Sequence, residues 1–433
     1  MNTIKNNIKA IVLPALLAGI IFTSCNKDVR QFGLPAVTAQ SGISLDSLLR
    51  ATPNDSLYYR MVVKASTGPI NYVNLLKAVN VTNQYTLFVP DNNGMKIFIN
   101  AASGGVVPLA APDAVFSGFI TNFLPLSAAA GIVGYNTIPQ RYDTAAISPL
   151  FPNMQVGTLI QIAPTTAPFV TLTSYPSKRG SQLWVNNIPM IAPLNVPAYN
   201  GIVQHVFTVV SPPQRLLWER LNTDADLTIF KAAILRADSG TAAPGALVTA
   251  FLTGPANFNV FAPTNAAMKA FLSAATGGAI PVAAPDAVFI GFLGSNSITT
   301  RLVKGIVVYH FFDDRNTTLS PAVLNKRPGR AYTVNFPPTP TAYPTLLSSA
   351  DSIGVTFKPV TLAATFTGPA VSAATVKGDV NPTASNLLIN STPDNTPSYG
   401  ATPPALPVVY IGTSDQNYVN GVLHKIDQVL RPQ

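Results

Sequence analysis

One block of sequence occurs twice in this chain, and the spacing between the copies sets the size of the folding unit. Residues 104–119 read GGVVPLAAPDAVFSGF, and residues 277–292 read GGAIPVAAPDAVFIGF, an offset of 173 residues. The same offset relates FVPDNNGMKIF at 88–98 to FAPTNAAMKAF at 261–271. Solenoid units recur every 20 to 50 residues or so, whereas a period this long has the size of a domain. The sequence therefore predicts two copies of one module.

The amino-terminal segment has the pattern of a secretory signal that ends at a cysteine. Lys5 and Lys9 precede an apolar run over 11–22, which is shorter than the roughly 20 residues a membrane-spanning helix needs. The run therefore predicts a signal peptide over 1–24. Cys25, the only cysteine of the chain, stands where bacterial lipoproteins carry their lipid-modified cysteine. We expect lipid attachment at Cys25 and a tether over 25–41; an ordinary signal with an incidental cysteine is the alternative.

Composition and motifs indicate a binding protein more than an enzyme or a nucleic-acid-binding protein. Charged residues make up 10% of the chain, and the net charge of +9 is scattered without a basic cluster that interleaves aromatic residues. The three histidines are His205, His310 and His424, and no HExxH, HxH or CxxC motif accompanies them. We therefore expect no catalytic residues, no cofactor and no metal site, and no nucleic-acid partner.

Hydrophobic periodicity places helices early in each copy and strands late. Apolar residues three and four apart predict helices, and alternating or β-branched runs predict strands. The second copy is longer, because 111 residues separate Tyr309 from Asn420 whereas 65 separate Tyr135 from Asn200. We expect the additional residues in a β-rich or loop insertion over about 317–400. The expected helices lie at 45–50, 58–65, 72–79, 214–221 and 227–236, the expected strands at 85–89 and 258–262, and Thr264 or Asn265 is expected as an N-cap.

Three motifs of the second copy resemble the fasciclin domain. FNVFAPTNAAMKAFL at 258–272 and NGVLHKIDQVL at 420–430 are similar to the two signature boxes of that family, and Val308-Tyr309-His310 is similar to its tyrosine–histidine motif. The first copy departs from the pattern in two places. Asn136 replaces the motif histidine, and Gln204 stands at the position of His424, so that His205 is shifted by one residue.

The resemblance implies an α+β fold of two fasciclin-like domains, each a β-sandwich wedge with helices packed on it. The domains would occupy 42–211 and 212–433, and we call them the first and second repeat. Fasciclin domains are mostly extracellular adhesion or matrix-binding modules, and their tyrosine–histidine motif has been proposed to contact receptors. By resemblance, Tyr309 and His310 are the candidate partner-binding residues; the alternative is a pair packed inside the domain.

These observations predict a lipid-anchored adhesion or binding protein of the Gram-negative cell envelope. We expect it on the outer membrane, facing the periplasm or the surface, with an extracellular protein, glycan or matrix partner. Two alternatives stay open, an accessory glycan-binding lipoprotein of an outer-membrane uptake system and a structural spacer. For the glycan alternative, aromatic side chains that could stack on sugar rings are Trp184, Tyr332, Tyr343 and Tyr399. The sequence determines neither the ligand nor the oligomeric state.

Overall fold

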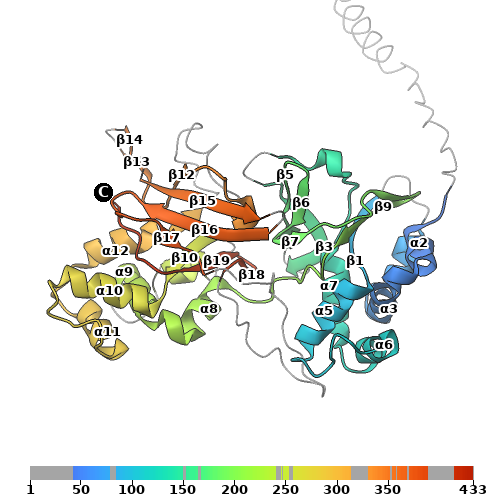
Figure 1. Cartoon of the computed structure of the whole chain (residues 1–433), viewed down its shortest axis with the longest axis horizontal. Helices are drawn as coiled ribbons and strands as arrows, with labels where there is room; N and C mark the ends of the chain where they lie inside the picture. The colour runs from blue at the N-terminus through green and yellow to red at the C-terminus, as the bar shows by residue number, and fades with distance from the viewer. Residues whose placement is uncertain are drawn as a thin grey trace, which may run out of the picture. The chain divides into compact units, whose positions relative to one another are not determined.

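The computed structural model describes most of the chain beyond the amino-terminal segment (Figure 1). The described residues are 42–78, 84–149, 153–163, 167–239, 245, 247–252, 257–313, 330–351, 354–356, 358–367, 370–388 and 414–432. Residues 43–433 form one compact unit, which contains both repeats, and residues 1–42 form another. The predicted signal peptide, Cys25 and the tether lie outside the described residues, as does Tyr399.

The first repeat begins with helices and ends with strands. The helical part contains α2 (Leu45–Ala51), η1 (Pro53–Asp55), α3 (Ser56–Ala65), α4 (Tyr72–Lys77), β1 (Tyr85–Pro90), α5 (Asn92–Ala102), α6 (Asp113–Asn122) and α7 (Leu126–Tyr135). The strand-rich part contains β2 (Thr137–Ile138), η2 (Thr144–Ala146), β3 (Val156–Ala163), β4 (Ala167–Ser174), β5 (Pro176–Arg179), β6 (Gln182–Val185), β7 (Ile188–Pro189), β8 (Val196–Ala198) and β9 (Gly201–Val206).

The second repeat follows the same order. Its helical part contains α8 (Leu217–Thr223), η3 (Ala225–Leu227), α9 (Thr228–Ser239), the π-helix η4 (Leu247–Leu252), β10 (Phe258–Pro263), α10 (Asn265–Ala275), α11 (Asp286–Gly294) and α12 (Thr300–Tyr309). Its strand-rich part contains β11 (Phe311–Asp313), η5 (Thr333–Asn335), β12 (Thr341–Pro344), β13 (Ser349–Asp351), β14 (Gly354–Thr356), β15 (Pro359–Thr367), β16 (Ala370–Gly378), β17 (Ser385–Asn386), β18 (Gln416–Tyr418) and β19 (Gly421–Ile426).

Each repeat is built around the same four-stranded sheet. The strand order is β2-β1-β9-β8 in the first repeat and β11-β10-β19-β18 in the second. In both sheets the two central strands run parallel, with Phe88 opposite Gln204 and Phe261 opposite His424. A parallel pair requires a long crossover, and the helices and strands between β1 and β9 supply it. The two signature boxes therefore meet as neighbouring strands, although they are far apart in the sequence.

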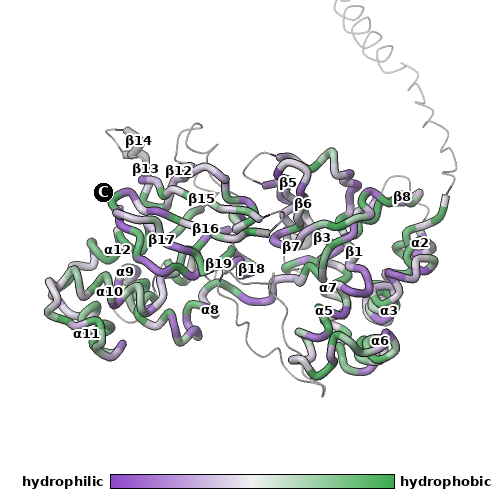
Figure 2. Tube along the Cα trace, in the orientation of Figure 1, coloured by the Kyte–Doolittle hydropathy of each residue, from purple (hydrophilic) through white to green (hydrophobic). Residues whose placement is uncertain are grey.

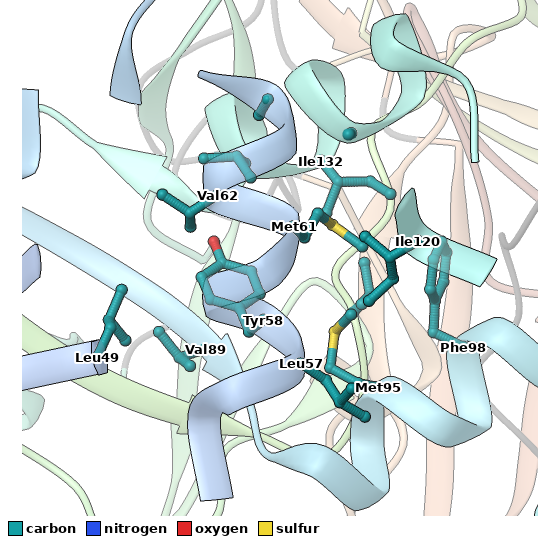
Figure 3. Close-up of a cluster of buried hydrophobic side chains, with 14 of the residues drawn as sticks. Leu49, Leu57, Tyr58, Met61, Val62, Val89, Met95, Phe98, Ile120 and Ile132 are labelled. Carbon is teal, nitrogen blue, oxygen red and sulfur yellow. The ribbon is translucent and has the colours of Figure 1, made fainter. Parts of the chain in front are cut away.

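The central strands are buried on both faces, because helices cover one face and further strands cover the other. In β1, Leu87 and Val89 pack into the helical core that Figure 3 shows, where Tyr58 of α3 lies among aliphatic and methionine side chains. Phe88 points the opposite way, into the core shared with β5 to β7. In β10, Val260 belongs to the helical core and Phe261 to the core against β15 and β16. The alternation has the period of two expected for a strand.

The predicted α+β class is confirmed, with helices and strands close to their predicted positions. Thr264 caps α10 by accepting a hydrogen bond from the Ala267 amide at 3.2 Å, so the first of the two proposed caps is the one used. Two helices were not predicted, α7 and α12. Their apolar residues surround the helix or their sequences are rich in small residues, and such segments carry a weak helical period.

The predicted insertion over 317–400 proves to be two additions separated by a segment that both repeats share. Thr144 donates its amide to Asn195 Oδ1 at 2.9 Å, and Thr333 donates its amide to Asp415 Oδ1 at 2.7 Å. The offset between matching residues is 174 at β2 and β11, rises by 15 to 189 at the two threonines, and rises by 31 to 220 at Asn195 and Asp415. The second addition includes strands of the β12-β15-β16-β17 sheet.

Identical polar residues in the two copies make identical contacts, which explains one part of the sequence repeat. Asn92 accepts a hydrogen bond from the Leu57 amide at 3.0 Å and donates to Asp113 at 3.0 Å. Asn265 repeats both contacts, accepting from the Ile229 amide at 3.1 Å and donating to Asp286 at 2.6 Å. Each asparagine thus joins the start of one helix to the start of another. A lysine completes each cluster, through the ion pairs Lys96–Asp113 and Lys269–Asp286.

A second repeated contact involves the Asn-Gly pair that begins β9 and β19. Asn200 Oδ1 accepts a hydrogen bond from the Leu45 amide at 2.9 Å, and Asn420 Oδ1 accepts one from the Leu217 amide at 2.9 Å. The following glycine lies against the neighbouring parallel strand. A Cβ atom on Gly201 would overlap the carbonyl oxygen of Tyr85 and would lie 2.7 Å from Leu45 Cδ1. Only glycine allows this close approach of strand and helix.

We therefore predict that Gly201→Ala destabilises the protein by about 1–3 kcal/mol, because the added methyl group forces the helix and strand apart. The measurement is the free energy of unfolding from urea titration. Gly118→Ala is the matched control, since Gly118 lies inside α6 and no atom lies within 4 Å of its Cβ position. Alanine there should leave stability unchanged or raise it by up to about 1 kcal/mol. Equal losses in the two variants would contradict the packing argument.

Candidate functional site

The tyrosine–histidine motif of the second repeat lies in the interior. Tyr309 and His310 have no exposed surface, and the Tyr309 hydroxyl donates to the Pro359 carbonyl. His310 Nδ1 lies 2.8 Å from the Ile306 carbonyl, and its Nε2 accepts the Leu430 amide at 2.9 Å. One ring nitrogen donates and the other accepts, so the imidazole is neutral, and burial lowers its pKa to about 4. The expectation of direct partner contact through these two side chains is therefore wrong for this conformation; both positions hold the fold.

The asparagine that replaces the motif histidine performs the same structural task in the first repeat. Asn136 donates to the Ile132 carbonyl at 2.8 Å and to the Val210 carbonyl at 2.8 Å. His310 likewise joins the last turn of its helix to the segment after the final strand, at Leu430. An amide and a neutral imidazole both bridge two backbone groups, so either residue connects the two segments.

His424 and Gln204 form a second pair of matching residues. His424 Nε2 lies 2.8 Å from the Ala331 carbonyl, and its Nδ1 accepts the Asp415 amide at 3.2 Å, so this ring is also neutral. Burial lowers the pKa of His424 to about 4. In the first repeat Gln204 Oε1 accepts the Asn195 amide at 2.9 Å. Asn195 and Asp415 both have a φ of 56°, a left-handed conformation that asparagine and aspartate tolerate better than most residues.

His205 differs from the other two histidines, because both its ring nitrogens face oxygen atoms. Nδ1 lies 2.8 Å from the Pro193 carbonyl and Nε2 lies 3.1 Å from Asp55 Oδ1. Both nitrogens donate only when the ring is a cation. Burial alone would lower the pKa of His205, but the hydrogen bonds to Asp55 and Pro193 outweigh it and raise the pKa. In the second repeat Lys425 occupies the matching strand position and pairs with Asp224 at 2.8 Å.

This arrangement predicts opposite effects of acid and alkali on stability. The raised pKa of His205 means that its ion pair stabilises the fold fully below about pH 6.5 and is lost as the pH rises through the folded-state pKa. The lowered pKa values of His310 and His424 mean that their stabilisation is lost as the pH falls from about 6.5 through about 4, by roughly 3 kcal/mol each. Free energies of unfolding across pH 4–9 measure both effects.

The His205→Gln variant separates the two effects. It should remove the loss of stability on the alkaline side and leave the loss on the acidic side unchanged, because His310 and His424 are untouched. Lys425 needs no variant, since an unperturbed lysine keeps its charge throughout this pH range. An unchanged alkaline slope in His205→Gln would show that His205 is not a cation in the folded protein.

A buried arginine joins the two repeats. Arg330 is 4% exposed, and its Nε donates to Asn257 Oδ1 at 2.8 Å, its Nη1 to the Tyr418 carbonyl at 2.6 Å and its Nη2 to the Val419 carbonyl at 2.8 Å. The guanidinium carbon lies 5.0 Å from the centre of the Tyr175 ring, which belongs to the first repeat. Among the described residues no carboxylate forms an ion pair with this charge, so amide and carbonyl oxygens and the tyrosine ring stabilise it.

The first repeat meets the second through one face of the β5–β6 hairpin. Ser177 lies opposite Trp184 in the register, and Arg179 is two residues further along β5, so the three share a face. Trp184 and Tyr175 pack against Tyr332 of the second repeat in a common apolar cluster. Arg179 donates to the Val334 carbonyl at 3.2 Å and lies over the Trp184 ring at 4.9 Å.

A cavity of about 200 Å³ lies between this hairpin and the segment after η5. Three polar atoms of its lining residues are buried without a hydrogen-bond partner, Trp184 Nε1, Ser177 Oγ and Asn153 Oδ1. An unpaired buried polar atom costs about 1–3 kcal/mol, so the cluster is unlike the satisfied interior elsewhere. The lining residues are Pro149, Asn153, Ser177, Lys178, Arg179, Trp184, Val334, Asn335, Phe336, Pro337, Pro338 and Tyr343. Sequence analysis missed this site, apart from two of its aromatic residues.

The aromatic residues predicted to stack on sugars are largely enclosed. Trp184 and Tyr332 are 1% and 0% exposed, so neither offers a free ring face to a sugar chain. Tyr343 is 6% exposed and lines the cavity. The structure thus brings Trp184 and Tyr343 to one place, although in the wall of a small cavity and not on an open surface.

The repeated sequence block also exposes the same apolar side chains in both copies. Leu109 and the matching Val282 are 52% and 51% exposed, and Val115 and Val288 are each 46% exposed. Figure 2 shows hydrophobic residues along α11 in the second repeat. We call these four residues the repeated apolar face. Their side chains contribute little to the core, so core packing does not explain why the two copies share this pattern.

Two further searches concern the described residues only. No group of three or more His, Cys, Asp or Glu is placed there to hold a metal ion. No single helix among them is long and apolar enough to cross a membrane; α6 and α7 reach that length and hydrophobicity only as a pair, with a bend of 109° between them.

Comparisons with known proteins leave the family of this chain open. No family model matches the sequence, and no curated protein matches it. A solved structure of a FAS1 domain pair from the insect cell adhesion molecule Fasciclin I is similar over 80% of this chain and 88% of that chain, with 12% sequence identity and a TM-score of 0.28. A TM-score this low does not establish a shared fold or function, and the resemblance to fasciclin domains stays with the sequence motifs.

Proposed function

We propose that the chain is a lipid-anchored binding protein of the cell envelope that presents one apolar face twice to a protein partner. The repeated apolar face is the observation that supports this function. Exposed apolar residues scattered singly are ordinary, whereas the same exposed residues at matching positions of two repeats suggest a common use. Two sites on one body allow a partner that carries two matching surfaces to bind with avidity.

The polar residues of the signature motifs support binding over catalysis. The His310 and His424 rings are neutral and enclosed, and the His205 ring is paired with Asp55. Asn92 and Asn265 are committed to joining helices. A general acid or base must reach its substrate, and none of these groups faces solvent. The partner surfaces are therefore sought on the exposed residues.

A second candidate function is glycan binding, which the cavity between the repeats favours. Its lining combines cationic, amide and aromatic side chains, a set suited to hydroxyl groups and ring faces of a sugar. The two functions use different surfaces, so they can be tested separately.

The anchoring part of the proposal predicts that the wild-type protein sediments with membranes. Cys25→Ala should move it to the soluble fraction, because the acyl chains that hold it at the bilayer would be absent. Fractionation followed by protease treatment of intact cells measures both attachment and exposure. A control substitution in the same segment, Ser24→Ala, should keep the protein on the membrane. A wild-type protein that is freely soluble would contradict the proposal.

The binding part predicts that a charge on the repeated apolar face weakens adhesion. The purified mature chain carrying Cys25→Ala is labelled and bound to intact cells and to extracted matrix. Leu109→Asp or Val282→Asp alone should lower apparent affinity at least about tenfold, because one of two linked contacts is lost, and the double variant should lower it further. Val380→Asp is the matched control, since Val380 is 47% exposed and lies outside the block. Equal binding by all four variants and the wild type would refute this surface.

A further inference from the structure

We propose that the cavity between the repeats binds a single negatively charged sugar residue of the uronic acid type. The site lies apart from the repeated apolar face and deepens the second candidate function, glycan binding, on which it rests. It is formed by the β5–β6 hairpin of the first repeat and by the segment from η5 to β12 of the second. It therefore exists only while the two repeats are packed together.

The charge of the lining favours an anion. Lys178 and Arg179 both line the cavity, which contains no aspartate or glutamate among its lining residues. No carboxylate in the described part of the chain forms an ion pair with either side chain, whereas Lys96, Lys269 and Lys425 all have one. Burial lowers the pKa of Arg179, which is the direction expected for a cation that lacks a counter-charge. A ligand carboxylate would supply that charge.

The unpaired polar atoms favour a ligand that also carries hydroxyl groups. Trp184 Nε1 can only donate, Asn153 Oδ1 can only accept, and Ser177 Oγ can do both. A sugar hydroxyl also donates and accepts, so it is able to match each of them. These atoms are covered by the cavity wall, and a rotation about χ1 of Ser177 is the smallest movement that turns a hydroxyl toward the ligand. Asn335 is partly exposed and offers a further amide.

The size and the apolar part of the wall favour one ring over a chain or a bare ion. A volume of about 200 Å³ is below the roughly 300 Å³ at which pockets for drug-sized ligands begin. Pro337, Pro338 and Tyr343 give the wall an apolar side, against which the C–H face of a pyranose ring can pack. An inorganic anion would leave this side without contact.

Isothermal titration of the mature chain tests the proposal with three probes, glucuronate, glucose and inorganic phosphate. We expect glucuronate to bind at least about tenfold more tightly than either of the others, because only glucuronate satisfies both the cations and the polar atoms. Raising the salt concentration should weaken glucuronate binding, since the attraction between exposed charges is screened. Phosphate that binds as tightly as glucuronate would overturn the sugar assignment in favour of a general anion site.

Two variants assign the binding to the cavity. Lys178→Gln should weaken glucuronate binding about tenfold and reduce its salt dependence, whereas Lys377→Gln, on the exposed side of β16, should change neither. Ser177→Ala should weaken binding of glucuronate with the salt dependence intact. Glucuronate binding that is undetectable, or that is unchanged in Lys178→Gln, would overturn the proposal. The Leu109→Asp, Val282→Asp double variant should bind glucuronate normally, so loss of adhesion and loss of sugar binding are distinguishable.

Discussion

The guanidinium group of Arg330 is the interaction on which the arrangement of the two repeats depends. It connects the segment before η5 to the turn between β18 and β19, and its face lies against Tyr175 of the first repeat. A buried cation with neutral acceptors is costly to form and more costly to disturb, because a missing acceptor would leave the charge unsolvated. The apolar cluster of Tyr175, Trp184 and Tyr332 surrounds the same point. The cavity follows from this contact, since its two walls come from different repeats.

The conserved-looking polar residues within the repeat therefore belong to the framework, and function moves to what the framework leaves exposed. The same histidine side chain has two protonation states here for a simple reason. His310 and His424 each meet one carbonyl oxygen and one backbone amide, which require a neutral ring. His205 meets a carbonyl and a carboxylate, which favour a cation. The repeated apolar face and the cavity are what remains for a partner.

Much of the fold was predictable because its signals are local. The alternating run of β10 and the cap at Thr264 depend on residues close in sequence, and the 173-residue offset required two similar units. The helices α7 and α12 were missed, because an evenly apolar or alanine-rich helix has little period. The partner-binding role of Tyr309 and His310 was predicted by resemblance and not by any property of the two residues, and their burial could not be seen in the sequence.

The sequence by itself determined that the chain consists of two related α+β repeats and which of their residues match. It also determined where glycine is needed and that the second repeat is longer. Only the tertiary structure decided which polar side chains are consumed inside the fold, because hydrogen-bond partners such as Asp55 and His205 lie 150 residues apart. It alone also decided that Ser177, Arg179 and Trp184 face the second repeat, since the hairpin register and the contact of two distant segments place them there.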